Sequence, residues 1–193
     1  AYSLSAHTLP SARGLGEPLT SRFTLQSGEK FLWTLCGDPQ QKILLASSFG
    51  YGFVTELGNL QSRVKAGKAL LSVPAGAQPV MPVPIRDAED SLVVCATSEG
   101  YLLAFPLNEE PELAKGKGNK LINVPPKRLK SGDEYMVGLA VMADKDEIRV
   151  WAGQRYLRLG HKDIEHFRGE RAHRGRKLPR GFQRVSRIEL AED

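Results

Sequence analysis

"LVVCATSEGYLLAFPL", residues 92–107, holds two short apolar runs on either side of a glycine. A short glycine-containing turn between two β-branched or aromatic runs is typical of a β-hairpin. The pattern recurs in "ILLASSFGYGFVTEL", residues 43–57, where Gly50 aligns with Gly100. A weaker third copy is "EIRVWAGQRYLRL", residues 147–159. The sequence therefore predicts three hairpins, each closed by a two-residue turn.

The first residues fit the end of the same element. In "AYSL", residues 1–4, Tyr2 lies 49 residues before Tyr51, which in turn aligns with Tyr101. The chain is therefore expected to begin inside a repeat and to be a piece of a longer polypeptide. Because Tyr51 and Tyr101 hold equivalent repeat positions, we interpret both as packing residues between repeats.

A second repeated element consists of glycines flanked by cations, which we call corners. The first three glycines are 51 residues apart, and the fourth follows after 57 more. The corners are residues 13–18, 63–68, 115–120 and 171–177, around Gly16, Gly67, Gly118 and Gly175.

Each corner leads into a further strand, as in "KALLSVP" and "NKLINVP", and another strand such as "VMPVPIRD" precedes the next hairpin. About four strands in about 50 residues are typical of arrays of β-blades. We therefore predict an all-β, propeller-like array of four-stranded blades that is incomplete at the N-terminus. It forms a single domain over residues 1–193, with repeats over 1–26 (partial), 27–75, 76–126 and 127–193.

Helical periodicity is weak, and only residues 111–116 and 161–167 are short helix candidates. Trp33 and Trp151 are each expected in a core strand. Cys36 and Cys95 stand in apolar contexts and are predicted to be buried free thiols. No apolar stretch approaches 18 residues, which excludes a transmembrane helix, and the N-terminus does not resemble a signal peptide.

The charge distribution indicates a polyanionic partner. The net charge is +5, and residues 113–131 carry six basic and no acidic side chains. Residues 155–187 carry eleven basic against three acidic ones. Charges of one sign that recur once per blade would line the rim of the array, where duplex DNA could bend around it through phosphate contacts alone. The plainer alternative is a set of solvated, glycine-rich turns.

The predicted DNA-binding residues are the cations of the corners and of the segments beside them. They are Arg13, Arg63, Lys65, Lys68, Lys115, Lys117, Lys120, Lys127, Arg128, Arg155, Arg158, Arg168, Arg171, Arg174, Arg176, Lys177, Arg180 and Arg184.

No catalytic residue is predicted, because no Ser-His-Asp combination has a supporting motif. No metal site is predicted either, since the spacing of His161, His166 and His173 matches no zinc pattern. The glycine-rich corners complete neither G-x-G-x-x-G nor a P-loop, so no nucleotide-binding motif is present.

Five stretches together resemble a known family. "HTLPSARGLGEPL", "SSFGYGFVTELGNL", "RVKAGKALLSVP", "AKGKGNKLINVP" and "LPRGFQRVSRIEL" are similar to the C-terminal domain of the A subunit of proteobacterial DNA topoisomerase IV. The resemblance covers nearly the whole chain. It implies a β-pinwheel, in which neighbouring blades exchange strands, and a non-catalytic domain that binds duplex DNA along its outer rim and supports strand passage, decatenation and supercoil relaxation.

The resemblance also implies partners outside this chain. The whole enzyme would be a heterotetramer of two A and two ATPase B subunits, cytoplasmic and nucleoid-associated, with ATP and Mg²⁺ used in other domains and no cofactor in this one. A chromosome-organising protein is a further partner that this family suggests. The related gyrase A domain carries a Q-R-R-G-G-K-G box that nothing here matches, which favours topoisomerase IV over gyrase.

The sequence is also compatible with two other functions. The same cations could bind an acidic partner protein, which would make the chain a protein-interaction module. An RNA-binding domain is the third interpretation, although no aromatic stacking motif supports it.

Overall fold

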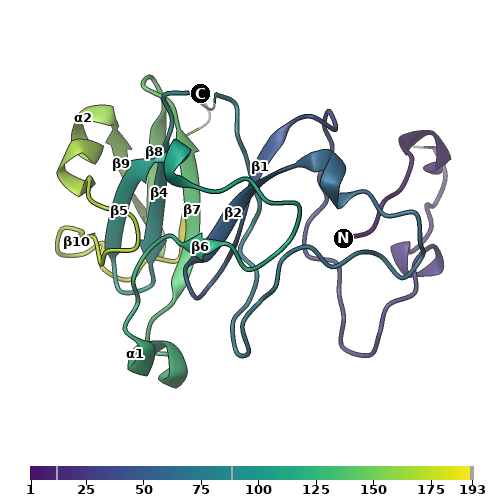
Figure 1. The fold of residues 1–193 in the computed structure, drawn as a ribbon, viewed down its shortest axis with the longest axis horizontal. Coiled ribbons are helices and arrows are strands. Elements are labelled where there is room, and N and C mark those ends of the chain that lie inside the picture. Colours follow the sequence, from purple (N-terminus) through teal and green to yellow (C-terminus); the bar gives the residue numbers. More distant parts are fainter. Residues whose placement is uncertain (12, 88, 192–193) are drawn as a thin grey trace.

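The computed structural model describes residues 1–11, 13–87 and 89–191, and within them it places eleven β-strands in three antiparallel sheets (Figure 1). The strands are β1 (Lys42–Ser47), β2 (Tyr51–Glu56), β3 (Val83–Pro84), β4 (Leu92–Thr97), β5 (Tyr101–Pro106), β6 (Asn119–Lys120), β7 (Met136–Met142), β8 (Glu147–Ala152), β9 (Arg155–Gly160), β10 (Arg176–Lys177) and β11 (Arg187–Leu190). The helices are α1 (Pro126–Ser131), α2 (His161–Ile164) and 3-10 turns at Ala6–Thr8, Leu19–Ser21, Leu57–Leu60, Leu107–Glu109 and Glu165–Phe167.

All three hairpins predicted from the apolar runs are present. They are β1–β2, β4–β5 and β8–β9, and they lie side by side across the molecule (Figure 1). The prediction of two-residue turns is wrong for the first two, which have three-residue loops over 48–50 and 98–100. Gly50 and Gly100 close these loops with φ of 78° and 80°, the left-handed conformation that ends a three-residue hairpin loop. Only the third hairpin has a two-residue turn, at residues 153–154.

Strands are exchanged between neighbouring parts of the chain. The first sheet has the order β3-β1-β2-β6 and the second β10-β5-β4-β7, so each hairpin is completed on both sides by strands that follow later in the sequence. The third sheet has the order β11-β8-β9. Each four-stranded sheet therefore combines strands from two of the sequence repeats 27–75, 76–126 and 127–193.

The two edges of each sheet have different surroundings. Contacts link β3 to β7 and β7 to β11, so these three edge strands face one another at the inside of the array. A groove of about 1000 Å³ lies between them. The strands β6 and β10, which form the last residues of the third and fourth corners, pair with β2 and β5 on the opposite edges. The corners thus lie on the outer side of the array.

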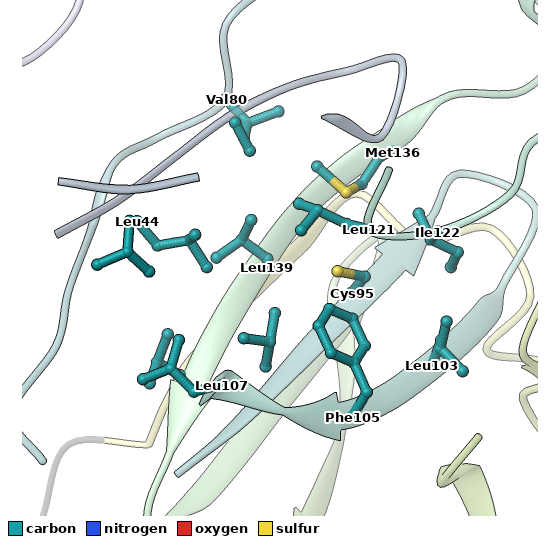
Figure 2. Close-up of a cluster of buried hydrophobic side chains, with 14 of the residues drawn as sticks. Leu44, Val80, Cys95, Leu103, Phe105, Leu107, Leu121, Ile122, Met136 and Leu139 are labelled. Carbon is teal, nitrogen blue, oxygen red and sulfur yellow. The ribbon is translucent and has the colours of Figure 1, made fainter. Parts of the chain in front are cut away.

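The central strands are buried on both faces, which explains their almost continuous apolar sequences. Alternate residues of β4 point to opposite sides. Val93 and Cys95 join the cluster between the first two sheets, shown in Figure 2, whereas Leu92 and Val94 pack toward the third sheet. A smaller cluster on the far face of the first sheet contains Phe53. The β4–β5 hairpin is therefore held by a sheet on either side of it.

The N-terminal 41 residues contain no strand in their described part, and several expectations fail there. Trp33 is 39% exposed and Cys36 is exposed, so neither belongs to a core, whereas Cys95 is fully buried. Trp151 lies in β8, as expected, but it is only partly buried. The first residue pairs with the second corner, because the Ala1 and Lys68 backbones exchange hydrogen bonds of 2.7 and 2.8 Å.

This pairing corrects the sequence alignment of the first residues. Ala1 lies opposite the residue that follows Gly67, just as Gly52 lies opposite Asn119 after Gly118. Tyr2 is therefore equivalent to Phe53 rather than to Tyr51, a shift of two residues.

The helix predictions are confirmed in one place only. Residues 161–167 form α2 and a following 3-10 turn, but residues 111–116 are not helical, because Glu112 bridges to β2 instead. The missed helix, α1, begins with Pro126 and ends before Gly132, whose φ is 75°. Proline at the start and glycine after the end are the signals that mark such a helix. None of the helices in the described part of the chain has the length and apolar character needed to cross a membrane.

Candidate nucleic-acid interface

The corner glycines bring the chain closer to the neighbouring strand than a side chain would allow. Gly67, Gly118 and Gly175 share a left-handed backbone, with φ of 75°, 77° and 76°. A Cβ atom on Gly118 would lie 1.9 Å from the carbonyl oxygen of Gly52, and one on Gly175 would lie 2.4 Å from that of Leu102. Glycine is thus required both for the turn and for the close approach.

Successive corners are hydrogen-bonded to one another in a row. The N–H of Ser72, after the second corner, donates to the carbonyl of Gly116 in the third corner over 2.8 Å. The N–H of Asn123, after the third corner, likewise donates to His173 in the fourth over 2.9 Å. Because both acceptors lie two residues before a corner glycine, the contact repeats from blade to blade. The second, third and fourth corners therefore form one continuous outer edge, which we call the corner row.

The third corner presents lysines to solvent. Lys115 and Lys117 are exposed, and the ammonium of Lys117 lies 4.3 Å from the centre of the Tyr51 ring. Lys120 is half-buried and donates to the side-chain oxygen of Asn123 over 2.7 Å. No carboxylate in the described part of the chain forms an ion pair with these three lysines.

The second corner is equally exposed. Arg63, Lys65 and Lys68 all face solvent, and the ammonium of Lys68 donates to the carbonyl of Asn59 over 2.8 Å. Arg13, in the first corner, is also exposed, but Gly16 makes no close approach to another segment. The structure therefore brings the second corner into the row and leaves the first outside it.

The fourth corner divides into anchoring and exposed cations. The guanidinium of Arg174 lies 2.7 Å from the buried carboxylate of Glu134 and 3.8 Å from the centre of the Tyr101 ring. Arg171 donates to the Lys120 carbonyl over 2.8 Å and lies 3.6 Å from the buried Glu110. The hydrogen bond from Arg171 to Lys120 ties the fourth corner to the third, and the buried carboxylates hold both arginines in place.

The other fourth-corner cations are exposed to solvent. Arg176 and Lys177 both face outward; Arg176 lies 3.3 Å from His166 and Lys177 lies over Tyr101.

The remaining candidates lie beside the corner row. Arg158 and Arg168 form surface ion pairs with Glu147 and Glu165, and Arg128 pairs with Glu134 over 3.2 Å. Arg155 donates to the Gly181 carbonyl and lies over Phe182, and the exposed cations without such contacts are Lys127, Arg180 and Arg184.

Sequence reasoning missed the partners of these cations. Tyr51 and Tyr101, expected as packing residues, each lie under the cation that precedes a corner glycine, Lys117 or Arg174. Their recurrence with the corners was the signal that could have predicted cation–π pairs. Nothing in the local sequence marks Glu110 or Glu134 as buried, because their burial depends on the exchange of strands.

Burial of Glu110 gives the domain a testable pH dependence. Loss of hydration raises the pKa of its carboxyl from 4.5 to about 8, and the nearby Arg171 offsets this only partly. Between these two pH values the folded state binds more protons than the unfolded state. The free energy of unfolding should therefore fall as pH rises through this window.

We expect Glu110→Gln to remove this slope. The variant should be more stable than the parent at pH 8 by about 2–3 kcal/mol and no more stable at pH 5. Urea unfolding at both pH values measures the difference, with the exposed Glu170→Gln as the matched control. Parallel stability curves for Glu110→Gln and the parent would contradict the expectation.

The described residues contain no group of three or more His, Cys, Asp or Glu side chains that could hold a metal ion. The site therefore consists of backbone corners, exposed cations and the aromatic rings beneath some of them, an arrangement that can bind anions.

An array of antiparallel blades that exchange strands along a row of glycine corners is a β-pinwheel. Comparison with solved structures gives the same class: the Escherichia coli ParC C-terminal domain matches with a TM-score of 0.88 and 39% identity, over 100% of this chain and 77% of that one. The DNA gyrase A C-terminal domain shares the fold, with a TM-score of 0.64 and 13% identity over 88% of this chain and 56% of that one.

The sequence comparison agrees. The chain is 49% identical over 187 residues to the A subunit of DNA topoisomerase 4 from Pseudomonas aeruginosa, which covers 97% of this chain and 25% of the relative. No family model matches the chain. The chain belongs to the family of C-terminal domains of the DNA topoisomerase IV A subunit. It spans about a quarter of the length of the curated relatives it matches.

Proposed function

We propose that the domain binds duplex DNA along the corner row, without sequence preference, as an accessory domain of topoisomerase IV. The observation that carries this proposal is the blade-to-blade hydrogen bonding of the second, third and fourth corners, which lines up exposed lysines and arginines on one outer edge. Cations that recur along one outer edge suit a stiff polyanion that bends around it. Membership of the topoisomerase family supports the same partner.

The contacts would be to phosphates rather than to bases. The corners are short turns that cannot enter a groove as a recognition element, and the longest helix of the described chain, α1, has six residues. Lysine ammonium groups act as point charges toward phosphate, and such contacts fix position without reading sequence. Bending a short duplex costs on the order of 1–6 kcal/mol, which several phosphate contacts can offset at low salt.

Within the whole enzyme the domain would be non-catalytic. It would hold a DNA segment during ATP-dependent strand passage, and so support decatenation and supercoil relaxation on the bacterial chromosome in the cytoplasm. The B subunits, ATP and Mg²⁺ would act through other domains of the heterotetramer. A chromosome-organising protein is a further proposed partner.

Salt dependence of DNA binding tests the proposal. Affinity for a random-sequence duplex should fall linearly with the logarithm of salt concentration, with a slope of about 0.9 per phosphate contact. Fluorescence anisotropy over a series of KCl concentrations measures that slope, with a second duplex of unrelated sequence as the control. Absence of binding at low salt would contradict the proposal and favour the protein-interaction module. A preference for single-stranded RNA would also contradict it.

A further inference from the structure

A hollow of about 410 Å³ opens on the outer side of the first sheet, where the third corner meets α1. It lies between the hairpin loop 48–50, the segment 72–74 that follows the second corner, β6 and α1; the last two are labelled in Figure 1. This volume falls within the range of small-ligand pockets. We call it the blade-junction pocket.

Three lysines and several apolar groups line the blade-junction pocket. The lysines are Lys117, Lys120 and Lys130, and no carboxylate is among the lining residues. None of the three forms an ion pair with another described residue. The apolar lining comprises Phe49, Tyr51, Val73, Pro74, Pro126 and Leu129.

The next blade has equivalent positions, and two of them carry acidic residues. Matching hydrogen bonds fix the equivalence: Ser48 Oγ accepts from the N–H of Gln78 over 2.9 Å, and Ser98 Oγ accepts from the N–H of Tyr135 over 3.2 Å. The residue before Tyr135 is the buried Glu134, and the residue before Gln78 is an alanine.

The hairpin loops of the two blades also differ by one acidic residue. One residue after Ser98 stands Glu99, whereas the residue after Ser48 is Phe49. The blade-junction pocket therefore lacks both of the acidic residues that its counterpart has.

Those two carboxylates neutralise the cations of the second blade. Arg174, which lies over Tyr101 as Lys117 lies over Tyr51, forms an ion pair of 2.7 Å with Glu134. Arg128 lies 3.2 Å from Glu134 and 3.4 Å from Glu99. In the blade-junction pocket Lys117, the counterpart of Arg174, remains and both acids are absent, so an anion from outside the protein can take the place of these carboxylates.

The apolar lining adds a second requirement to the ligand. Half-buried Phe49, Tyr51, Pro74 and Leu129 offer flat and aliphatic surfaces beside the ammonium groups. A purely inorganic anion would leave these surfaces in contact with water. A ring that stacks on them, joined to an anionic group, would satisfy both parts of the pocket.

We infer that the blade-junction pocket binds a nucleotide unit, with its base against Phe49 and Tyr51 and its phosphate at the three lysines. The unit can come from a free nucleotide or from an unpaired nucleotide of a DNA strand. The inference does not rest on duplex binding by the corner row, since a mononucleotide can be tested alone.

Calorimetric titration with deoxyadenosine monophosphate tests the inference. Binding should be about tenfold or more tighter than that of deoxyadenosine or inorganic phosphate, each of which lacks one half of the ligand. Equal binding of inorganic phosphate would overturn the nucleotide assignment, and no binding of the mononucleotide would overturn the site.

Variants locate the binding. Phe49→Glu supplies the acid found in the second blade and should weaken mononucleotide binding at least about tenfold. Lys117→Ala should do the same without adding a charge to the hairpin loop, and it remains informative if the first variant folds poorly. Lys145→Ala, an exposed lysine outside the pocket, removes the same charge as Lys117→Ala and should bind as the parent does. Equal losses in all three variants would overturn the location.

Two DNA probes distinguish the sources of the nucleotide. A duplex with a single-stranded overhang should compete with the mononucleotide, and a blunt duplex should not, if the unit comes from an unpaired strand. Competition by neither duplex assigns the pocket to free nucleotides. If the overhang duplex and the blunt duplex compete equally with the mononucleotide, and still do so in the Phe49→Glu variant, then phosphate contacts on the outer edge alone displace the mononucleotide. That result would overturn the base contact.

Discussion

Gly118→Ala is expected to destabilise the domain by about 3–5 kcal/mol, a large part of the stability of a typical domain. Two effects add. An alanine at φ of 77° costs about 1 kcal/mol in backbone conformation. The larger effect is steric, because the new Cβ would lie 1.9 Å from the Gly52 carbonyl oxygen and must push β6 away from β2. Loss of that pairing also loosens the buried Leu121 and Ile122, which follow β6 in the core.

A matched control separates the two effects. Gly132 has nearly the same φ, 75°, but a Cβ there would meet nothing within 4 Å. Gly132→Ala should therefore cost only the conformational part, about 1 kcal/mol. Thermal unfolding should show a decrease of about 2–4 °C in Tm for each kcal/mol. Equal Tm values for the two variants would mean that the close approach of the corner to β2 does not stabilise the fold.

The repeat could be read from the sequence because its signals are local. Short apolar runs on either side of a glycine at a fixed place are enough to predict β1–β2, β4–β5 and β8–β9. The exchange of strands could not be worked out in this way, because periodicity does not tell which copy supplies the edge strand; the family resemblance alone implied it. For the same reason the pairing of β6 with β2, across almost 70 residues, was not predicted residue by residue.

The candidate site could also be predicted only in part from the sequence. The corners were found as segments because glycine and lysine recur together, and three of them do line one outer edge. The sequence alone does not distinguish the exposed lysines from the anchoring arginines. Arg171 and Arg174 look like their neighbours in a basic run, yet buried glutamates from other segments hold them. The charge pattern of a sequence shows where cations are, but the role of each cation depends on which acidic residues the fold places beside it.

Replacement of the three third-corner lysines with alanine is expected to weaken duplex binding by about a hundredfold at low salt. Lys115, Lys117 and Lys120 have no carboxylate partner within the described part of the chain, so their charge remains available to phosphate. Each exposed ammonium–phosphate contact contributes about 1 kcal/mol at low salt, and three of them change Kd by about a hundredfold. The salt slope should fall by about 0.9 for each phosphate that no longer meets a lysine, which mere unfolding would not produce. The melting temperature should stay close to that of the parent, because Lys115 and Lys117 are exposed and the half-buried Lys120 loses only its hydrogen bond to Asn123.

The matched control removes the same charge from elsewhere on the molecule. Lys30, Lys145 and Lys162 are exposed and lie outside the corners, so their replacement with alanine lowers the net charge equally. If binding depends only on overall charge, both triple variants will lose affinity alike in a gel-shift titration, and the corner row will have no special role. If the geometry of the row matters, the control should retain most of its affinity and the parent's salt slope. The comparison thus tests placement rather than charge, which is the part of the proposal that depends on strand exchange and on the glycines that permit it.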